Sequence, residues 1–190
     1  ALHQKELEVY IEDEVAKCLI QTCLPSAVRS RINLKIIGSA TAISKQLAAL
    51  YVRGEEKPTI AIFDGDQKGL QKDNLNHANK MSENPSEKFS TWFLDRISYL
   101  PGNTWPEAWI IQKCMEVPDL VANALGLEED QVTEILEYGL QAGKHKEFFE
   151  IAEHVGLDKN QCLQHLCSII CKTFSEEFSP LREKIIAALD

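Results

Sequence analysis

The sequence predicts an α/β protein, in which a parallel sheet flanked by helices is followed by a C-terminal helical region. Two observations carry this prediction. Short apolar runs alternate with amphipathic segments up to residue 64, as in the strand–helix–strand units of a parallel sheet. From residue 104 onward, apolar residues recur only at helical spacing. We therefore divide the chain into an α/β core over residues 1–103 and a helical extension over residues 104–190, which together form one compact unit.

Each element of the α/β core follows from its local pattern. The strands are short runs rich in β-branched and aromatic residues, and the helices have apolar residues every three or four positions. Pro25 and Gly38 are the breakers that end the first helix and the second strand. In chain order we expect a strand over residues 7–12, a helix over 13–24, a strand over 32–37, a helix over 41–51 and a strand over 59–63.

The remainder of the chain is polar at first and then helical. Residues 67–88 contain few apolar positions and predict a solvated loop beside the candidate site at Asp64 and Asp66, which is described below. A fourth strand is expected within residues 91–100, stopped by Pro101-Gly102. The expected helices after it begin at Pro106 and then cover residues 118–124, the region of 132–136, 148–155, 163–174 and 180–189.

The strand over residues 59–63 ends in Asp64-Gly65-Asp66. Its run of apolar residues is typical of a strand buried on both faces, and ligands of open α/β sheets bind beyond the carboxyl ends of the strands. Gly65 allows a sharp turn that leaves room for both carboxylates. Paired carboxylates suit a hard cation such as Mg²⁺. The simpler interpretation is that Asp-Gly is only a turn signal.

Further charged residues are expected at the same edge of the sheet. Glu12 ends the first strand, and Glu107 begins the helix that follows the fourth strand. Lys144 and Lys146 flank His145 before a late helix. Each acid alone is more simply a solvated charge or a helix-start acid. Their common position at strand ends strengthens the prediction of one acidic pocket.

Composition limits the classes of function. A net charge of −9 argues against non-specific binding of nucleic acid by the whole surface, although it is compatible with a metal-dependent nuclease. No run reaches the ~20 apolar residues that span a bilayer. Because the chain has neither a signal-peptide pattern nor an initiating Met, we expect a cytoplasmic piece of a longer protein.

The cysteines offer a second possible site. Cys162, Cys167 and Cys171, together with His165, have the residue types of a zinc site. On one helix, however, Cys167 and Cys171 point away from Cys162 and His165. We therefore favour buried thiols that pack as small hydrophobic groups over a metal site.

Three motifs resemble the Toprim domain, the fold shared by topoisomerases, bacterial primases and several nucleases. They are a strand ending in glutamate (Tyr10-Ile11-Glu12-Asp13), a second strand ending in glycine (Ile36-Ile37-Gly38-Ser39) and a strand followed by Asp-x-Asp (Phe63-Asp64-Gly65-Asp66). Two later stretches, Leu100-Pro101-Gly102-Asn103-Thr104-Trp105-Pro106-Glu107 and Gly143-Lys144-His145-Lys146-Glu147-Phe148-Phe149, resemble the overcoming-lysogenisation-defect (OLD) nucleases, most closely their class 2. The resemblance spans residues 7 to about 156.

This resemblance implies a two-metal nuclease that cleaves DNA phosphodiester bonds with Mg²⁺ or Mn²⁺. It makes Glu12, Asp64 and Asp66 metal ligands and Glu107 a carboxylate for the second metal, and Glu12 could also act as general acid or base. Lys144 would stabilise charge on the scissile phosphate, with Lys146 as the alternative. The implied partners are DNA and an N-terminal ABC-type ATPase domain of the parent chain, through which the protein could form a homodimer.

One position departs from the family pattern. Ala16 stands four residues after Glu12, where some related nucleases have another acid; Asp13 or Glu14 could replace it, or both could be helix-start acids. The chain also has no Walker A sequence, so it should not hydrolyse ATP by itself.

Two other functions remain open. The Asp-Gly-Asp motif superficially resembles that of phosphatases with an aspartyl nucleophile, although Gln67-Lys68 follows it where those enzymes have Gly-Thr. Alternatively, the chain is a non-catalytic module in which the acids bind Mg²⁺ and the helical half binds a protein partner. A topoisomerase or primase is less favoured, because no recognisable tyrosine nucleophile or zinc module is found.

Overall fold

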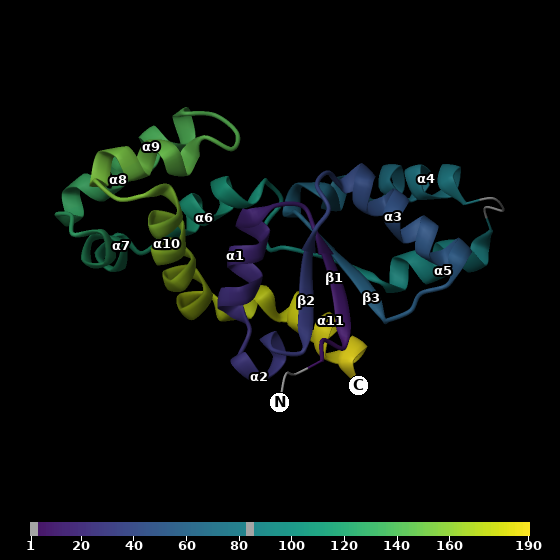
Figure 1. The fold of residues 1–190 in the computed structure, drawn as a ribbon. Helices are drawn as coiled ribbons and strands as arrows, with labels where there is room; N and C mark the ends of the chain where they lie inside the picture. The colour runs from purple at the N-terminus through teal and green to yellow at the C-terminus, as the bar shows by residue number, and fades with distance from the viewer. Residues whose placement is uncertain (1–3, 83–85) are drawn as a thin grey trace.

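The computed structural model describes residues 4–82 and 86–190 and contains a parallel four-stranded sheet with the strand order β2-β1-β3-β4 (Figure 1). Val9 of the central strand β1 pairs with Leu34 on one side and with Ile60 on the other. The strands are β1 (Leu7–Ile11), β2 (Ile32–Ile36), β3 (Thr59–Phe63) and β4 (Ile97–Tyr99). The predicted α/β class, with a parallel sheet flanked by helices and a helical C-terminal region, is confirmed.

Helices account for most of the rest of the described chain. Those that connect the strands are α1 (Glu14–Cys23), α2 (Ser26–Arg29), α3 (Ala40–Arg53), the 3₁₀ helix η1 (Gly65–Leu70), α4 (Gln71–Met81) and α5 (Glu87–Asp95). Those after the sheet are α6 (Pro106–Cys114), α7 (Pro118–Leu125), α8 (Glu129–Gln141), α9 (Glu147–Val155), α10 (Lys159–Thr173), η2 (Ser175–Phe178) and α11 (Ser179–Leu189).

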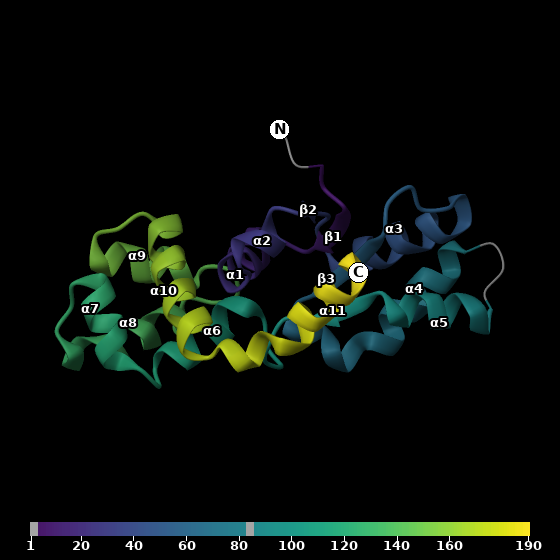
Figure 2. The same cartoon turned by 90° about the horizontal axis from the view of Figure 1, so that it is seen from below.

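The two faces of the sheet are covered by different sets of helices. Val9 and Ile62 point into a core formed with α1 and the helices of the C-terminal region, whereas Tyr10 and Phe63 point into a second core formed with α3, α4 and α5. The alternation of side chains along a strand produces this division. In Figure 2, α3–α5 lie to one side of the sheet, α11 runs along it, and α6–α10 extend to the other side.

The order of the strands creates a natural position for a site. From β1 the chain goes outward through α1 and α2 to β2, and it then returns through α3 to β3 on the opposite side of β1. The helix that follows β1, α1, and the helices that follow β3, α4 and α5, lie on opposite faces, so the connections diverge between β1 and β3. Ligands of open α/β sheets bind at such a switch point, beyond the carboxyl ends of the strands.

Strand β3 matches its prediction in both position and burial. All five of its residues are buried, as expected for a strand covered on both faces. Strands β1 and β2 end one residue earlier than predicted, and β4 occupies only three residues of the predicted stretch 91–100.

The prediction of a solvated loop over residues 67–88 is wrong for the part that the structure describes. Most of that stretch forms η1 and α4, and α5 begins at Glu87; residues 83–85 lie outside the described residues. Only Asn74 and Ala78 of α4 are buried, so the helix packs against α3 through a stripe too narrow to give a clear hydrophobic period.

Helix α5 was also missed. Phe89 and Phe93 lie four residues apart on its buried face, and the Ser86 hydroxyl caps it by accepting a hydrogen bond of 3.1 Å from the Phe89 N–H. By composition the aromatic residues of this segment favour a strand, because aromatic residues are enriched in strands. Their spacing of four is the helical signal.

Two glycine-containing turns meet at the carboxyl edge of the sheet. A Cβ atom on Gly65 would lie 2.5 Å from the Gly102 carbonyl oxygen. A Cβ atom on Gly102 would lie 2.2 Å from Cδ1 of Trp109, and the positive φ of Gly102 (83°) also disfavours other residues. The turn after β3 therefore packs directly against the turn after β4.

We expect Gly102→Ala to lower the free energy of unfolding by about 2–4 kcal/mol, because strain from the left-handed backbone adds to the clash with Trp109. Gly126→Ala is the matched control: its φ is also positive (68°), but nothing lies within 4 Å of the added methyl group. The control should lose only about 1 kcal/mol. Urea denaturation of both variants measures the difference, and equal losses would contradict the close contact.

Candidate metal centre

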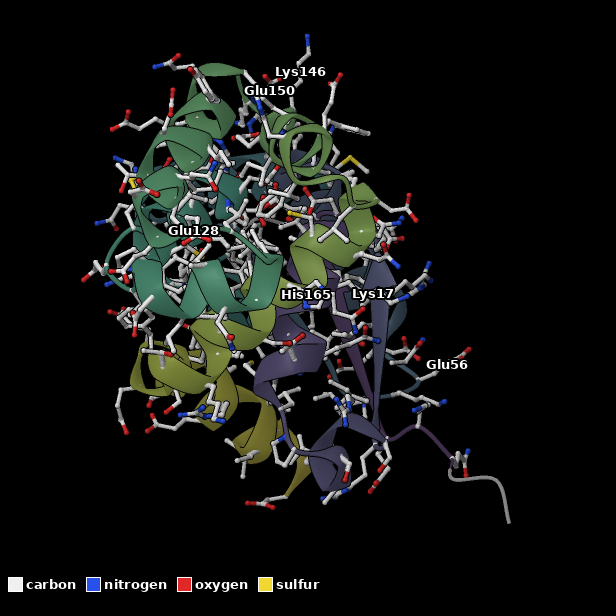
Figure 3. All side chains as sticks on the ribbon, turned by 90° about the vertical axis from the view of Figure 1, so that its left-hand side faces the viewer. Lys17, Glu56, Glu128, Lys146, Glu150 and His165 are labelled. Carbon is white, nitrogen blue, oxygen red and sulfur yellow. The ribbon has the colours of Figure 1, made fainter. Side chains whose placement is uncertain are left out.

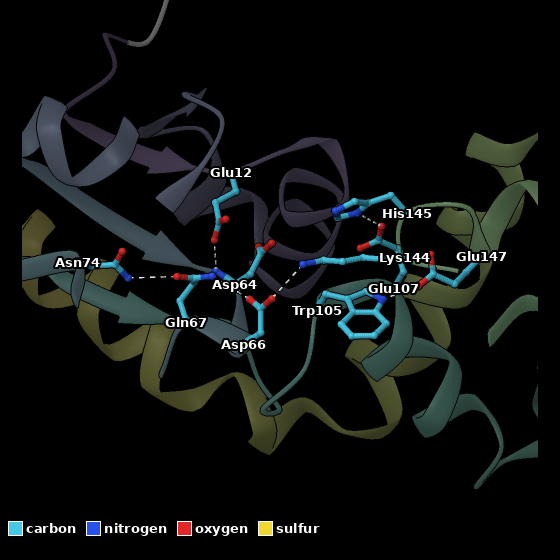
Figure 4. A network of polar contacts seen from close by, with 10 residues as sticks. All are labelled: Glu12, Asp64, Asp66, Gln67, Asn74, Trp105, Glu107, Lys144, His145 and Glu147. Atoms are coloured by element: carbon cyan, nitrogen blue, oxygen red, sulfur yellow. Dashed lines mark hydrogen bonds and ion pairs between the residues drawn. The ribbon is translucent and has the colours of Figure 1, made fainter. Parts of the chain in front are cut away.

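Glu12 and Asp64 come together because β1 and β3 are neighbours in the sheet. Each follows the last residue of its strand, and Oε2 of Glu12 accepts a hydrogen bond of 2.7 Å from the backbone N–H of Asp64 (Figure 4). The expectation that Glu12 would lie beside Asp64 is therefore met. This contact also directs the Glu12 carboxylate across the end of the sheet.

The environment of Asp64 disfavours its negative charge. The residue is 5% exposed, and its Oδ1 atom is buried without a hydrogen-bond partner. Burial, followed by repulsion from Glu12, Asp13, Asp66 and Glu107, raises the pKa of Asp64 to about 9. A bound cation would stabilise this carboxylate as an anion, because it would replace the hydration that burial removes.

The pKa of Glu12 is also raised, but less than that of Asp64. Burial raises the pKa of Glu12 to about 7, against the opposing effect of the hydrogen bond from the Asp64 N–H. Asp66 and Asp13 add to the increase through repulsion, whereas Lys144 lowers it. The residue is therefore able to exchange a proton near neutral pH.

Lys144 reaches the acidic edge from the loop between α8 and α9. Its Nζ lies 3.4 Å from Oδ2 of Asp66 and 5.5 Å from the centre of the Trp105 ring. The indole N–H of Trp105 donates a hydrogen bond to Glu147, which is 1% exposed. The buried Glu147 therefore fixes the indole ring of Trp105, and Lys144 extends over this ring. Lys146 instead lies on the outer surface of the helical region, near Glu150 (Figure 3).

A second group of ligands lies beside the first. One ligand atom each from Asp13, Glu107 and His145 lies within 4.8 Å of the others. Glu107 is 4% exposed, and its Oε1 atom is buried without a hydrogen-bond partner, whereas its Oε2 lies 2.7 Å from Nδ1 of His145. Burial raises the pKa of Glu107, and the contact with His145 offsets part of this increase.

The predicted residues do not all converge to the same extent. Glu12, Asp64 and Asp66 lie at one edge of the sheet, but they do not form a set with all ligand atoms within 4.8 Å of one another. Glu107 lies with Asp13, which the sequence left as one of two alternatives. The other alternative, Glu14, is exposed. Asp13 also caps α1, since its Oδ1 accepts a hydrogen bond from the Ala16 N–H.

Sequence reasoning gave no role to His145 or Glu147. His145 has a left-handed backbone, with a φ of 72°, which no local pattern signals for a histidine. The available signal was the stretch Gly143-Lys144-His145, in which a glycine precedes two residues of basic type just before a helix. Glu147 is a helix-start acid in the sequence, and only the packing of Trp105 against it reveals its burial.

The cysteines behave as the favoured interpretation expected. Cys162, Cys167 and Cys171 are buried on α10, whereas His165 is exposed on the same helix (Figure 3). Within residues 4–82 and 86–190, they do not form a group of ligands like that of Asp13, Glu107 and His145. The thiols pack in the core between α10, α1 and α6.

The donor set fits divalent cations. It combines several carboxylates with one imidazole, and two buried carboxylate oxygens, Oδ1 of Asp64 and Oε1 of Glu107, have no hydrogen-bond partner. Oxygen ligands suit Mg²⁺ and Mn²⁺, and an imidazole suits transition metals. The polar network of Figure 4 is therefore a candidate metal centre.

Comparison with solved structures places the fold among the C-terminal regions of OLD proteins. The C-terminal region of the Xanthomonas campestris pv. campestris OLD protein matches with a TM-score of 0.55 and 12% identity, covering 97% of this chain and 96% of that one. The corresponding region of the Burkholderia pseudomallei OLD protein matches with a TM-score of 0.55 and 11% identity over 98% of each chain. The predicted resemblance to OLD proteins is thus confirmed for the fold.

Comparisons of sequence give a different result. No protein-family model matches this chain, and no curated protein is significantly similar to it.

Of the helices in the described residues, none combines the length and the apolar character that crossing a bilayer requires.

We expect the metal-free protein to lose stability as the pH rises. Unfolded carboxyl groups have pKa values near 4, whereas those of folded Glu12 and Asp64 are about 7 and about 9. The folded state therefore holds these protons more tightly; its advantage is complete below pH ~4 and is lost as the pH rises through these two values. A bound divalent cation should restore stability at pH ~8. Urea denaturation with a chelator and with added Mn²⁺ measures both effects.

Asp64→Asn tests the origin of this pH dependence. It should flatten the curve and make the metal-free protein about 2 kcal/mol more stable at pH ~8, because a neutral amide removes both the cost of burying a charge and the repulsion among the acids. Glu56→Gln is the control that should leave the curve unchanged, since Glu56 is exposed and precedes β3, whereas Asp64 follows the opposite end of that strand (Figure 3). An unchanged curve in Asp64→Asn would show that these carboxyls are not the cause.

Proposed function

We propose that this chain is a metal-dependent nuclease domain that hydrolyses DNA phosphodiester bonds with two divalent cations. The observation that carries the proposal is the gathering of carboxylates at the carboxyl edge of the sheet, two of them with unpartnered buried oxygens, beside Lys144. The resemblance of the motifs to Toprim domains of OLD nucleases, and the likeness of the fold to OLD C-terminal regions, support the same reaction.

The proposed roles follow the arrangement of the side chains. Glu12, Asp64 and Asp66 hold the first ion, and Glu107, joined by Asp13, holds the second. Mg²⁺ or Mn²⁺ held by these residues would supply Lewis acidity at the scissile phosphate and would activate water for attack. Glu12, which lies beside Asp64 at the end of β1, also serves as the general acid or base. Lys144 compensates the negative charge that gathers on the phosphate.

The surrounding side chains position Lys144 for this role. Its ammonium group lies between Asp66, at 3.4 Å, and the Trp105 ring, whose centre is 5.5 Å away. Lys144 is exposed, so a phosphate can approach it without displacing the core. Lys146, on the outer surface, is the less suitable alternative.

DNA binding needs positive charge that this chain lacks, since its net charge is −9. The two ions offset part of this charge. We propose that the remainder comes from an N-terminal ABC-type ATPase domain in the parent chain, through which a homodimer forms. Both structural neighbours are C-terminal regions of OLD proteins, which supports such an arrangement.

Nicking of supercoiled plasmid in the presence of Mg²⁺ or Mn²⁺ tests the proposed reaction. We expect wild-type activity, no nicking with Asp66→Ala, and a loss of about 10²–10³-fold with Lys144→Ala, as for removal of one group that stabilises developing charge. Lys146→Ala is the matched control and should remain near wild type. If the two lysine variants exchange their effects, Lys146 takes the catalytic role instead.

The same preparation distinguishes the two alternatives. Release of phosphate from a small phosphomonoester without nicking would indicate a phosphatase with an aspartyl nucleophile. Metal binding without either activity, also in a chain that retains the ATPase domain, would indicate a non-catalytic module. Chelation of the metal should abolish nicking, and added Mn²⁺ should restore it.

A further inference from the structure

The group formed by Asp13, Glu107 and His145 differs chemically from the rest of the centre. Glu12, Asp64 and Asp66 offer only oxygen atoms, whereas this group offers two carboxylates and one imidazole within 4.8 Å of one another. Mg²⁺ is a hard cation that prefers oxygen ligands, and imidazole favours the divalent transition metals. The two halves of the centre are therefore expected to differ in the metal that they prefer.

Glu107 supplies an independent observation that points to a cation at this group. Its carboxylate is almost completely buried, and its Oε1 atom has no hydrogen-bond partner. The contact with His145 uses only the other oxygen, Oε2. An unpaired buried carboxylate oxygen is unfavourable, and coordination to a cation is one of the few arrangements that remove this cost.

The backbone at His145 directs its ring toward the acids at a conformational cost. Its φ of 72° is unusual for a residue with a Cβ atom, and among the described residues His145 alone combines a side chain with a positive φ. Gly143, two residues earlier, also has a positive φ. The resulting turn places Nδ1 of His145 2.7 Å from Oε2 of Glu107. Strained conformations of this kind are concentrated at functional sites.

We propose that Asp13, Glu107 and His145 form a binding site for a divalent first-row transition metal, with affinity that increases from Mn²⁺ through Co²⁺ to Zn²⁺ and exceeds that for Mg²⁺. This inference specifies the second metal of the proposed nuclease and therefore rests on that function for its purpose. Three protein ligands leave coordination positions for water or substrate, as in catalytic rather than structural metal sites.

The three ligands are supplied by separate elements that already hold them close together. Nδ1 of His145 lies 2.7 Å from Oε2 of Glu107, so the imidazole is directed toward the carboxylate with which it would share the ion. Asp13 is already fixed by its capping hydrogen bond to the Ala16 N–H. One ligand is therefore pre-positioned by α1, one by α6 and one by the loop before α9.

The test measures metal binding directly. The chain is first freed of metal with a chelator and then titrated with Zn²⁺ and with Mg²⁺ by calorimetry, while the imidazole signals of His145 are followed by NMR. We expect one Zn²⁺ that shifts these signals and that a large excess of Mg²⁺ does not displace. His145→Gly should weaken Zn²⁺ binding by about a hundredfold and change Mg²⁺ binding far less.

Glycine is the informative substitution because it removes the imidazole and accepts the positive φ, so the variant should fold at least as well as the wild type. His154→Ala is the matched control, since His154 lies 3.2 Å from Glu150 in an exposed histidine–glutamate pair on α9. This variant should bind Zn²⁺ as the wild type does. Circular dichroism confirms that both variants are folded.

Co²⁺ separates this site from the buried thiols. Binding at Asp13, Glu107 and His145 should give visible ligand-field bands without the near-ultraviolet band of thiolate coordination. Zn²⁺ binding that is unchanged in His145→Gly, easy displacement by Mg²⁺, or a thiolate band would each overturn the inference. The outcomes also separate the two proposals. Plasmid nicking together with unaltered Zn²⁺ binding in His145→Gly would contradict only the transition-metal site. Zn²⁺ binding that depends on His145, without nicking, would contradict only the nuclease function.

Discussion

The repulsion among carboxylates that are partly removed from water is the constraint on which the centre depends. Asp64 is almost fully buried and faces Glu12, Asp13, Asp66 and Glu107, and each of these charges raises its pKa. A protein selected only for stability would replace such residues with apolar or neutral ones. The fold retains the repulsion, and what compensates it is Lys144, from the helical region, together with the cations that the free carboxylate oxygens would accept.

The architecture sustains this arrangement from both faces of the sheet. Both faces of β3 are buried, one in the core with α1 and the C-terminal helices and the other in the core with α3–α5. The end of β3, which leads into Asp64, is therefore held in place beside the other acids. The turns at Gly65 and Gly102 meet backbone to backbone, which couples the end of β3 to the segment that leads into α6. Glu107 is thereby positioned by a contact in which no side chain of the centre takes part.

Sequence reasoning located the sheet edge because its signals are local. Thr59–Phe63 is apolar throughout, as a doubly covered strand must be, and adjacent parallel strands bring Glu12 beside Asp64. It failed for α4, where the buried stripe is only Asn74 and Ala78, and for α5, where aromatic residues favoured a strand. It gave His145 no role because the left-handed turn that directs this ring depends on tertiary packing rather than on sequence spacing.

The change in pattern near residue 104 does not coincide with a boundary of the centre. The α/β part contributes Asp13 and Asp66, whereas the loop between α8 and α9 contributes Lys144 and His145. Because one apolar core runs from β1 through α1 to α10, the position of that loop is set by how the helical region packs on the sheet. Any motion of the helical region relative to α1 would separate the basic residues from the acids, so the same packing that stabilises the fold also determines whether the centre is assembled.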